Sequence, residues 1–227
     1  IGTTVTSVLI GLKIKDYALP IIAAGSFLIF FFQNKKYKNI GGVLLGFGLL
    51  FFGLDVMGSK LKVLANTVEF VKMIESVADA PIIGLALGAV STALIQSSSA
   101  TIGILQTIYS EAEGNFPLIS AVAILFGNNI GTTVTAVLAS IGGSVAAKRT
   151  ALAHVLFNVI GSVFFFIFLI PYTNLISKIA TLSGLEQYDA LVISYAHVGF
   201  NLINTFVMFF FIKQLVWVVT VLIKGDD

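Results

Sequence analysis

Two clusters of uncharged polar side chains lie inside apolar stretches of this chain. The first, Gln96-Ser97-Ser98-Ser99, lies in the apolar stretch 81–109, and the second, Gly127-Asn128-Asn129-Ile130-Gly131-Thr132-Thr133, lies in 117–141. Hydroxyl and carboxamide groups donate hydrogen bonds without a fixed charge, and their oxygens also suit a hard cation. Where a helix is interrupted, its freed N–H groups favour an anion and its freed carbonyls a cation. Such clusters can hold an oxyanion beside a sodium ion without a buried arginine.

The composition excludes an ordinary soluble domain. Of the 227 residues, 57% are hydrophobic and 11% are charged, whereas soluble domains carry about 25% charged residues. The absence of cysteine excludes disulfides, iron–sulfur clusters and thiolate zinc sites. The formal charge of +2 comes from few residues of both signs, so no nucleic-acid partner is expected. The chain is therefore expected to be an integral membrane protein.

Several stretches have the length and apolarity of membrane helices, which need about 20 residues. The sequence predicts spans over 17–32, 40–54, 151–170 and 190–212. Within the second, Gly42 and Gly46 form a GxxxG pair that would let another helix approach closely. Residues 59–79 alternate apolar and charged positions with helical spacing, which predicts an amphipathic interfacial helix; a solvated connector is the alternative.

The first ten residues are repeated later in the chain. Residues 1–10 match residues 130–139 at eight of ten positions, with an offset of 129. Such duplication is typical of transporters built from two related halves. Because the first copy begins at residue 1, we expect the natural protein to extend N-terminally and to carry a second polar hairpin there.

A second repeat contains the two histidines. Residues 153–158 and 196–201 match at five of six positions, and each copy places a histidine four residues before an asparagine, as in His154 with Asn158 and His197 with Asn201. Histidine inside a membrane is a candidate functional residue. Hydrogen bonding between neighbouring helices is the interpretation that we favour. A zinc site is disfavoured because no carboxylate repeats with the histidines.

The topology of 81–109 has two interpretations. If this stretch is a re-entrant hairpin, the two copies of the first repeat are inverted, and seven of the thirteen basic residues face the cytoplasm. If the stretch crosses the membrane once, nine of the thirteen basic residues face the cytoplasm. The distribution of basic residues therefore favours the single crossing.

The two polar clusters resemble motifs of a known family. Gln96-Ser97-Ser98-Ser99 is similar to the QSSS motif of the type II sodium–phosphate cotransporters, and 127–133 is similar to the G-x-N-I-G-T-T segment that follows it there. The resemblance covers essentially the whole chain and extends to the His–Asn segments of the bacterial members. It implies an all-α polytopic membrane protein with two inverted repeats, re-entrant helical hairpins and broken helices. It also implies sodium-driven phosphate transport by alternating access, in a bacterial inner membrane.

The resemblance also implies the site. Phosphate would be held by Gln96, Ser97, Ser98, Ser99, Asn128 and Asn129. Sodium, the coupling ion, would be held by Gln96, Ser97, Ser99, Thr101, Thr132, Thr133, Thr3 and Thr4, the last two being first-repeat counterparts. No other cofactor or metal is implied. One QSSS hairpin is missing from this sequence, so a complete site needs the missing first repeat or a second chain.

On this interpretation the chain divides into five parts. These are the tail of the first repeat (1–16), linking helices (17–58), the interfacial helix (59–80), the QSSS hairpin with a broken GNNIGTT helix (81–147), and C-terminal membrane helices (148–227).

Three other functions were weighed. A sodium-coupled carrier of another small oxyanion shares the same chemistry. A non-transporting membrane scaffold would tolerate Ser98→Ala, whereas a carrier would change its apparent affinity. An intramembrane hydrolase would need Ser98 activated by His154 or His197, but no Gly-x-Ser-x-Gly or Ser-x-x-Lys motif is present, so the protein is not expected to be an enzyme.

Overall fold

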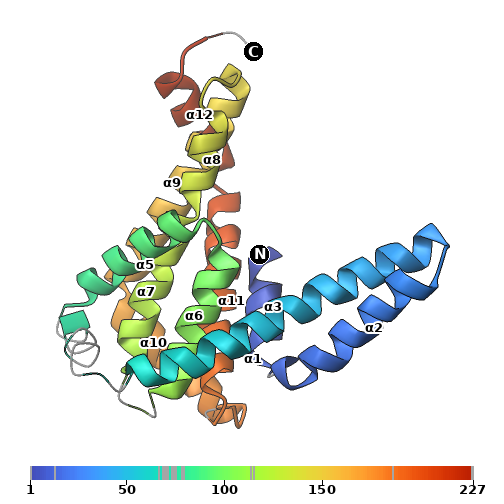
Figure 1. The fold of residues 1–227 in the computed structure, drawn as a ribbon. Helices are drawn as coiled ribbons and strands as arrows, with labels where there is room; N and C mark the ends of the chain where they lie inside the picture. The colour runs from blue at the N-terminus through green and yellow to red at the C-terminus, as the bar shows by residue number, and fades with distance from the viewer. Residues whose placement is uncertain are drawn as a thin grey trace.

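The structure, a computed structural model, describes residues 2–12, 14–65, 67, 72, 76–77, 80–112, 114, 116–185 and 187–225. Within these ranges the chain is helical and has no strand, which confirms the all-α prediction. The helices are α1 (Gly2–Gly11), α2 (Ala18–Phe31), α3 (Lys35–Ala65), α5 (Pro81–Ile95), α6 (Ser98–Glu111), α7 (Leu118–Gly131), α8 (Thr133–Ser140), α9 (Val145–Ile167), α10 (Leu169–Leu182), α11 (Asp189–Phe209) and α12 (Ile212–Leu222), with a 3-10 turn at Ile14–Tyr17. Figure 1 shows their arrangement.

Four helical segments of the described chain are long and apolar enough to cross a membrane. They are Lys35–Met57 in α3, Leu118–Ser140 across α7 and α8, α9, and α11. The predicted span 17–32 corresponds to α2, which has only 14 residues and is shorter than a spanning helix. The chain is thus a polytopic helical membrane protein.

The predicted span 151–170 ends earlier than expected. Phe168, with φ −98° and ψ 26°, separates α9 from α10. Pro171, which follows the predicted span directly, lies in the first turn of α10. Proline is tolerated there because a backbone N–H in the first turn has no partner within the helix.

The predicted interfacial helix is covered only in part. Residues 59–65 continue α3 without a break, so they are not the start of a separate helix. Of residues 66–79, only 67, 72, 76 and 77 are described, and the rest of this prediction lies outside the described residues.

Helices α2 and α3 form a hairpin that projects from the other helices, while the second half of α3 packs against α6 (Figure 1). Glycines bring the two backbones together: a Cβ on Gly25 would lie 2.5 Å from the Leu45 nitrogen, and one on Gly41 would lie 2.7 Å from the Gly25 oxygen. The predicted pair, Gly42 and Gly46, has no atom within 4 Å of the Cβ position. The GxxxG prediction is therefore wrong for this hairpin, because the neighbouring helix face turns toward α2.

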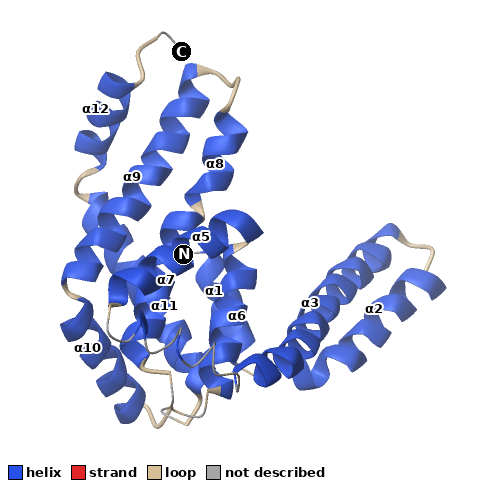
Figure 2. Cartoon of the chain, turned by 60° about the vertical axis from the view of Figure 1, so that its left-hand side comes forward, coloured by secondary structure: helices blue, strands red, loops and turns tan. Residues whose placement is uncertain are grey.

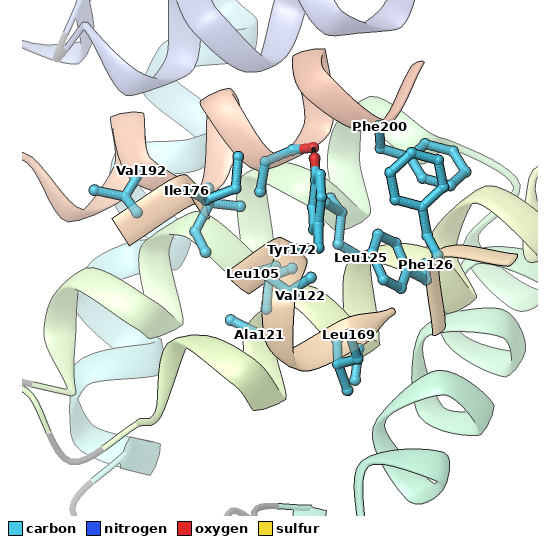
Figure 3. Close-up of a cluster of buried hydrophobic side chains, with 14 of the residues drawn as sticks. Leu105, Ala121, Val122, Leu125, Phe126, Leu169, Tyr172, Ile176, Val192 and Phe200 are labelled. Atoms are coloured by element: carbon cyan, nitrogen blue, oxygen red, sulfur yellow. Dashed lines mark hydrogen bonds between the residues drawn. The ribbon is translucent and has the colours of Figure 1, made fainter. Parts of the chain in front are cut away.

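An aromatic cluster joins α7, α9, α10 and α11 (Figure 3). The Phe126 ring centroid lies 5.8 Å from Phe165, 5.6 Å from Tyr172 and 5.3 Å from Phe200. The Tyr172 hydroxyl donates a hydrogen bond to the carbonyl oxygen of Ala196. Each aromatic pair adds about 0.5–1.5 kcal/mol beyond its burial. The cluster fixes the part of α7 that carries the second polar motif, which begins at the next residue.

Candidate functional site

The QSSS motif forms the tip of a helical hairpin. Helix α5 ends at Ile95 and α6 begins at Ser98, so Gln96 and Ser97 make the connection. Gln96 has φ 57° and is the one non-glycine residue with positive φ in the described chain. Its N–H donates to the Thr92 carbonyl oxygen over 2.7 Å, and the Ser97 hydroxyl caps α6 by accepting from the Ala100 N–H over 3.3 Å.

The two arms of this hairpin contact each other directly behind its tip. The Thr92 and Thr101 hydroxyl oxygens lie 3.2 Å apart, and the Thr101 hydroxyl also lies 2.9 Å from the Ser97 carbonyl oxygen. The stretch 81–109 is therefore two helices joined by a turn and not one continuous helix. Whether it crosses the membrane or re-enters stays a prediction.

Glycines allow α5 and α7 to pack with their backbones in close contact. A Cβ on Gly88 would collide with the backbone of Ile124, and a Cβ on Gly127 would collide with that of Leu85. Gly131 faces Ala89 in the same way. The glycines of the second motif therefore bring α7 against the hairpin arm that leads to Gln96.

Asn128 is buried beside the hairpin with an unsatisfied side chain. It is 2% exposed, and neither Oδ1 nor Nδ2 has a hydrogen-bond partner among the described residues. It lines a cavity of about 220 Å³ between α5, α6 and α7, together with Ser91 and Thr101. A buried unpaired polar group costs about 1–3 kcal/mol. The structure thus brings Asn128 and Thr101, predicted from separate motifs, to one cavity.

Asn129 and the following threonines are already satisfied by their own helix. The Asn129 Nδ2 donates to the Leu125 carbonyl over 3.0 Å. The hydroxyl of Thr132 donates to the Asn128 carbonyl and that of Thr133 to the Ile130 carbonyl, each over 2.8 Å.

The GNNIGTT helix is interrupted at one residue, Thr132. Thr132 separates α7 from α8, yet its φ of −56° and ψ of −27° are helical, and its N–H bonds to the Asn128 carbonyl over 3.1 Å. The interruption is therefore slight, because the Thr132 N–H stays bonded to a carbonyl of α7. The threonine hydroxyls of this segment bond back to carbonyls of the same helix, as such residues do in apolar surroundings.

The first-repeat threonines lie in the first turn of α1. Thr3 is exposed and Thr4 is buried. Ser7, one turn further along α1, meets α6 at Gln106, which is eight residues, or about 12 Å, beyond Ser98.

Gln106 is a buried polar residue that the sequence analysis missed. Its Nε2 lies 3.0 Å from the Ser7 carbonyl oxygen and 2.8 Å from that of Ala190. The hydroxyl of Ser194 lies 2.7 Å from the same nitrogen. This network joins α6 to α1 and α11. The one sequence feature that could have indicated this network is a single glutamine, Gln106, within an otherwise apolar stretch.

The His–Asn segments do not join helices through their asparagines. Asn158 donates to the His154 carbonyl and Asn201 to the His197 carbonyl, each over 3.0 Å within one helix. The interpretation as interhelical hydrogen bonds is wrong for these carboxamides. His197 is 1% exposed, and its Nδ1 has no partner in the described chain. Neither histidine hydrogen-bonds to Ser98 among the described residues.

The fold and the site define a polytopic helical membrane protein with a polar hairpin tip beside a small-residue helix. The chain belongs to the Na+/Pi-cotransporter family, whose model matches residues 1–59 and 56–185. This confirms the resemblance carried by the two polar motifs.

Curated relatives agree with this assignment. YqeW of Bacillus subtilis, named as uncharacterised, is 34% identical over 180 residues, which are 79% of this chain and 58% of that protein. YjbB of Escherichia coli K12, named as a candidate inorganic phosphate export protein, is 25% identical over 83% of this chain and 34% of its own length. Human sodium-dependent phosphate transport protein 2B is 30% identical over 44% of this chain and 15% of that protein. The chain thus spans little more than half the length of YqeW and a third of YjbB. No solved structure matches.

Proposed function

We propose that the chain supplies a QSSS half-site for a carrier that moves inorganic phosphate across a bacterial inner membrane with sodium as the coupling ion. Membership of the Na+/Pi-cotransporter family supports the substrate class. The names of the Escherichia coli and human relatives support phosphate, and the human name supports sodium.

The observation that carries the proposal is the unsatisfied carboxamide of Asn128. Its Nδ2 is a donor without an acceptor, and its Oδ1 is an acceptor without a donor. A phosphate oxygen would accept from Nδ2, and a sodium ion would bind Oδ1. One ligand pair would thus satisfy both atoms. This would couple the two ions, because each would favour the carboxamide orientation that the other needs.

We expect the hairpin tip to supply further polar groups, although Gln96 and the three serines do not line the cavity that holds Asn128. Ser97, Ser98 and Ser99 are half-buried at the start of α6, whereas Gln96 is exposed. Hydroxyls without a nearby fixed charge bind an anion weakly enough to release it, which a carrier requires. Asn129, Thr132 and Thr133 would contribute to the site only by giving up bonds to their own helix. Thr3 and Thr4 remain predicted sodium ligands.

Alternating access would involve movement of the tip together with α7, because α5 and α7 are in close backbone contact. The base of α6 is anchored to α1 and α11 through Gln106, whereas the described hydrogen bonds at the tip are internal to the hairpin. The direction of flux would follow the two ion gradients, so uptake and export are both possible outcomes of one mechanism.

The test is uptake of radiolabelled phosphate into sealed proteoliposomes that contain the full-length protein. An inward sodium gradient is expected to drive accumulation, whereas an equal potassium gradient is not. Excess sulfate and arsenate, added separately, test the alternative of another oxyanion. Equal rates in sodium and potassium would exclude sodium coupling, and stronger competition by sulfate than by unlabelled phosphate would reassign the substrate.

A further inference from the structure

An apolar groove runs between α9 and α12 and reaches α11. Its volume is about 320 Å³, and its lining is apolar apart from two carboxamides; it includes Leu156, Ile160, Leu215, Val218, Asn204 and Gln214. Figure 2 shows α9 and α12 side by side along one flank of the molecule. The Asn204 Nδ2 donates to the Phe157 carbonyl over 3.3 Å, so this buried donor needs no polar ligand.

Basic residues lie beyond one end of the groove, at the start of α9 and after the end of α12. The Arg149 Nε donates to the Ile223 carbonyl over 3.1 Å, and its guanidinium also bonds to the Gly225 carbonyl over 2.9 Å. These bonds hold the C-terminal end of α12 against the start of α9. They bring Lys148 and Lys224 together, and both are exposed.

The groove and the basic residues share α9, although no basic residue of the described chain lines the groove itself. Leu156 lies eight residues, or about 12 Å, from Lys148 along the helix axis. Asp226 and Asp227, which follow Gly225 in the sequence, lie outside the described residues. An apolar groove with basic side chains about two helical turns beyond its end matches a molecule with an apolar chain and an anionic head.

We propose that this groove binds an acyl chain of an anionic phospholipid, with the headgroup at Lys148, Arg149 and Lys224. Helices α9 and α11 both have the length and apolarity of membrane spans, so the groove between them faces acyl chains in the bilayer. With either topology of 81–109, we expect Lys148, Arg149 and Lys224 to lie on the cytoplasmic side. Basic pockets between membrane helices on that side bind anionic headgroups. This site is separate from the QSSS hairpin, and the proposal does not rest on phosphate transport.

Trp217 makes the site measurable. It is the single tryptophan of these 227 residues, it precedes the groove residue Val218, and it is 67% exposed. The full-length protein is titrated with phosphatidylglycerol or phosphatidylcholine brominated on the acyl chains, and tryptophan fluorescence is recorded. The Trp217→Phe variant supplies the background. Half-maximal quenching is expected at a roughly fivefold lower mole fraction of brominated phosphatidylglycerol.

Two pairs of variants separate the headgroup from the acyl chain. Lys148→Gln with Lys224→Gln is expected to abolish the preference for phosphatidylglycerol, whereas Lys178→Gln, at an exposed position on α10, keeps it. Ile160→Phe, which fills the groove, is expected to reduce quenching by both lipids, whereas Ile170→Phe at an exposed site does not.

Three results would overturn the proposal. The first is equal quenching of the unmodified protein by the two lipids, and the second is a phosphatidylglycerol preference that survives loss of both lysines. The third is a Trp217 signal that neither lipid quenches, which would show that a protein segment covers the groove.

Discussion

The hydroxyl oxygens of Thr92 and Thr101 lie 3.2 Å apart and join the two arms of the QSSS hairpin behind its tip. Thr101 also bonds to the carbonyl oxygens of Ser97 and Ser98, over 2.9 and 3.2 Å. One hydroxyl thus holds the start of α6 and the end of α5 in register. The three serines are presented from a closed turn rather than from a loose loop.

Thr101→Val should loosen this turn while keeping the side-chain volume. The loss of a buried hydroxyl that serves three oxygens is expected to lower the free energy of unfolding by about 1–3 kcal/mol. Thermal unfolding in detergent measures the change. Thr150→Val is the control. Thr150 is exposed, and the hydrogen bond described for its hydroxyl is to the Ala146 carbonyl of the same helix. Equal melting temperatures for the two variants would show that Thr101 does not stabilise the hairpin.

Substitutions at Gln96 should separate the turn from the carboxamide. Because φ is 57°, Gln96→Gly keeps the turn and is expected to leave the melting temperature unchanged or slightly higher, while it weakens phosphate uptake. Gln96→Val places a β-branched residue in the left-handed region, which costs about 1–2 kcal/mol. Gln187→Val, at an exposed loop residue, is the control and is expected to leave the melting temperature unchanged. If Gln96→Gly transported phosphate at the normal rate, the carboxamide would not belong to the site.

Adjacent glycines of α3 should respond differently to alanine. Gly41→Ala is expected to disrupt the α2–α3 hairpin, because its Cβ would lie 2.7 Å from a backbone oxygen of α2. Gly42→Ala meets open space and should stabilise α3 by up to about 1 kcal/mol through helix propensity. Thermal unfolding of the two variants is the comparison. A destabilised Gly42→Ala would mean that another helix packs on that face.

The sequence predicted the all-helical class, the polar clusters and the duplication, because composition, run length and identity are properties of the chain itself. It failed where the outcome depends on which face of a helix is turned inward. The choice of Gly41 over Gly42 and the inward position of Gln106 are of this kind. The back-bonding of Asn158 and Asn201 could not be predicted either, since a carboxamide at that spacing reaches its own helix and a neighbour equally well.

For the site, the motifs predicted which residues are polar but not which remain unsatisfied. Asn128 and Asn129 are adjacent and chemically identical, yet only Asn129 finds a carbonyl on its own helix. The difference arises from the contact of α7 with α5 and α6, which encloses Asn128 in the cavity with Ser91 and Thr101. The division into five segments and the roles of the individual ligands stay predictions.

The central claim is that phosphate and sodium meet at Asn128. The most direct measurement is sodium-dependent uptake of radiolabelled phosphate by the full-length protein carrying Asn128→Ala, with Asn174→Ala, at an exposed site on α10, as the matched control. We expect Asn128→Ala to raise the concentrations of both phosphate and sodium that give half-maximal uptake by about tenfold each, equivalent to about 1.4 kcal/mol per ion, while the control is unchanged and both variants fold. Uptake by Asn128→Ala with unchanged dependence on both ions would contradict the claim.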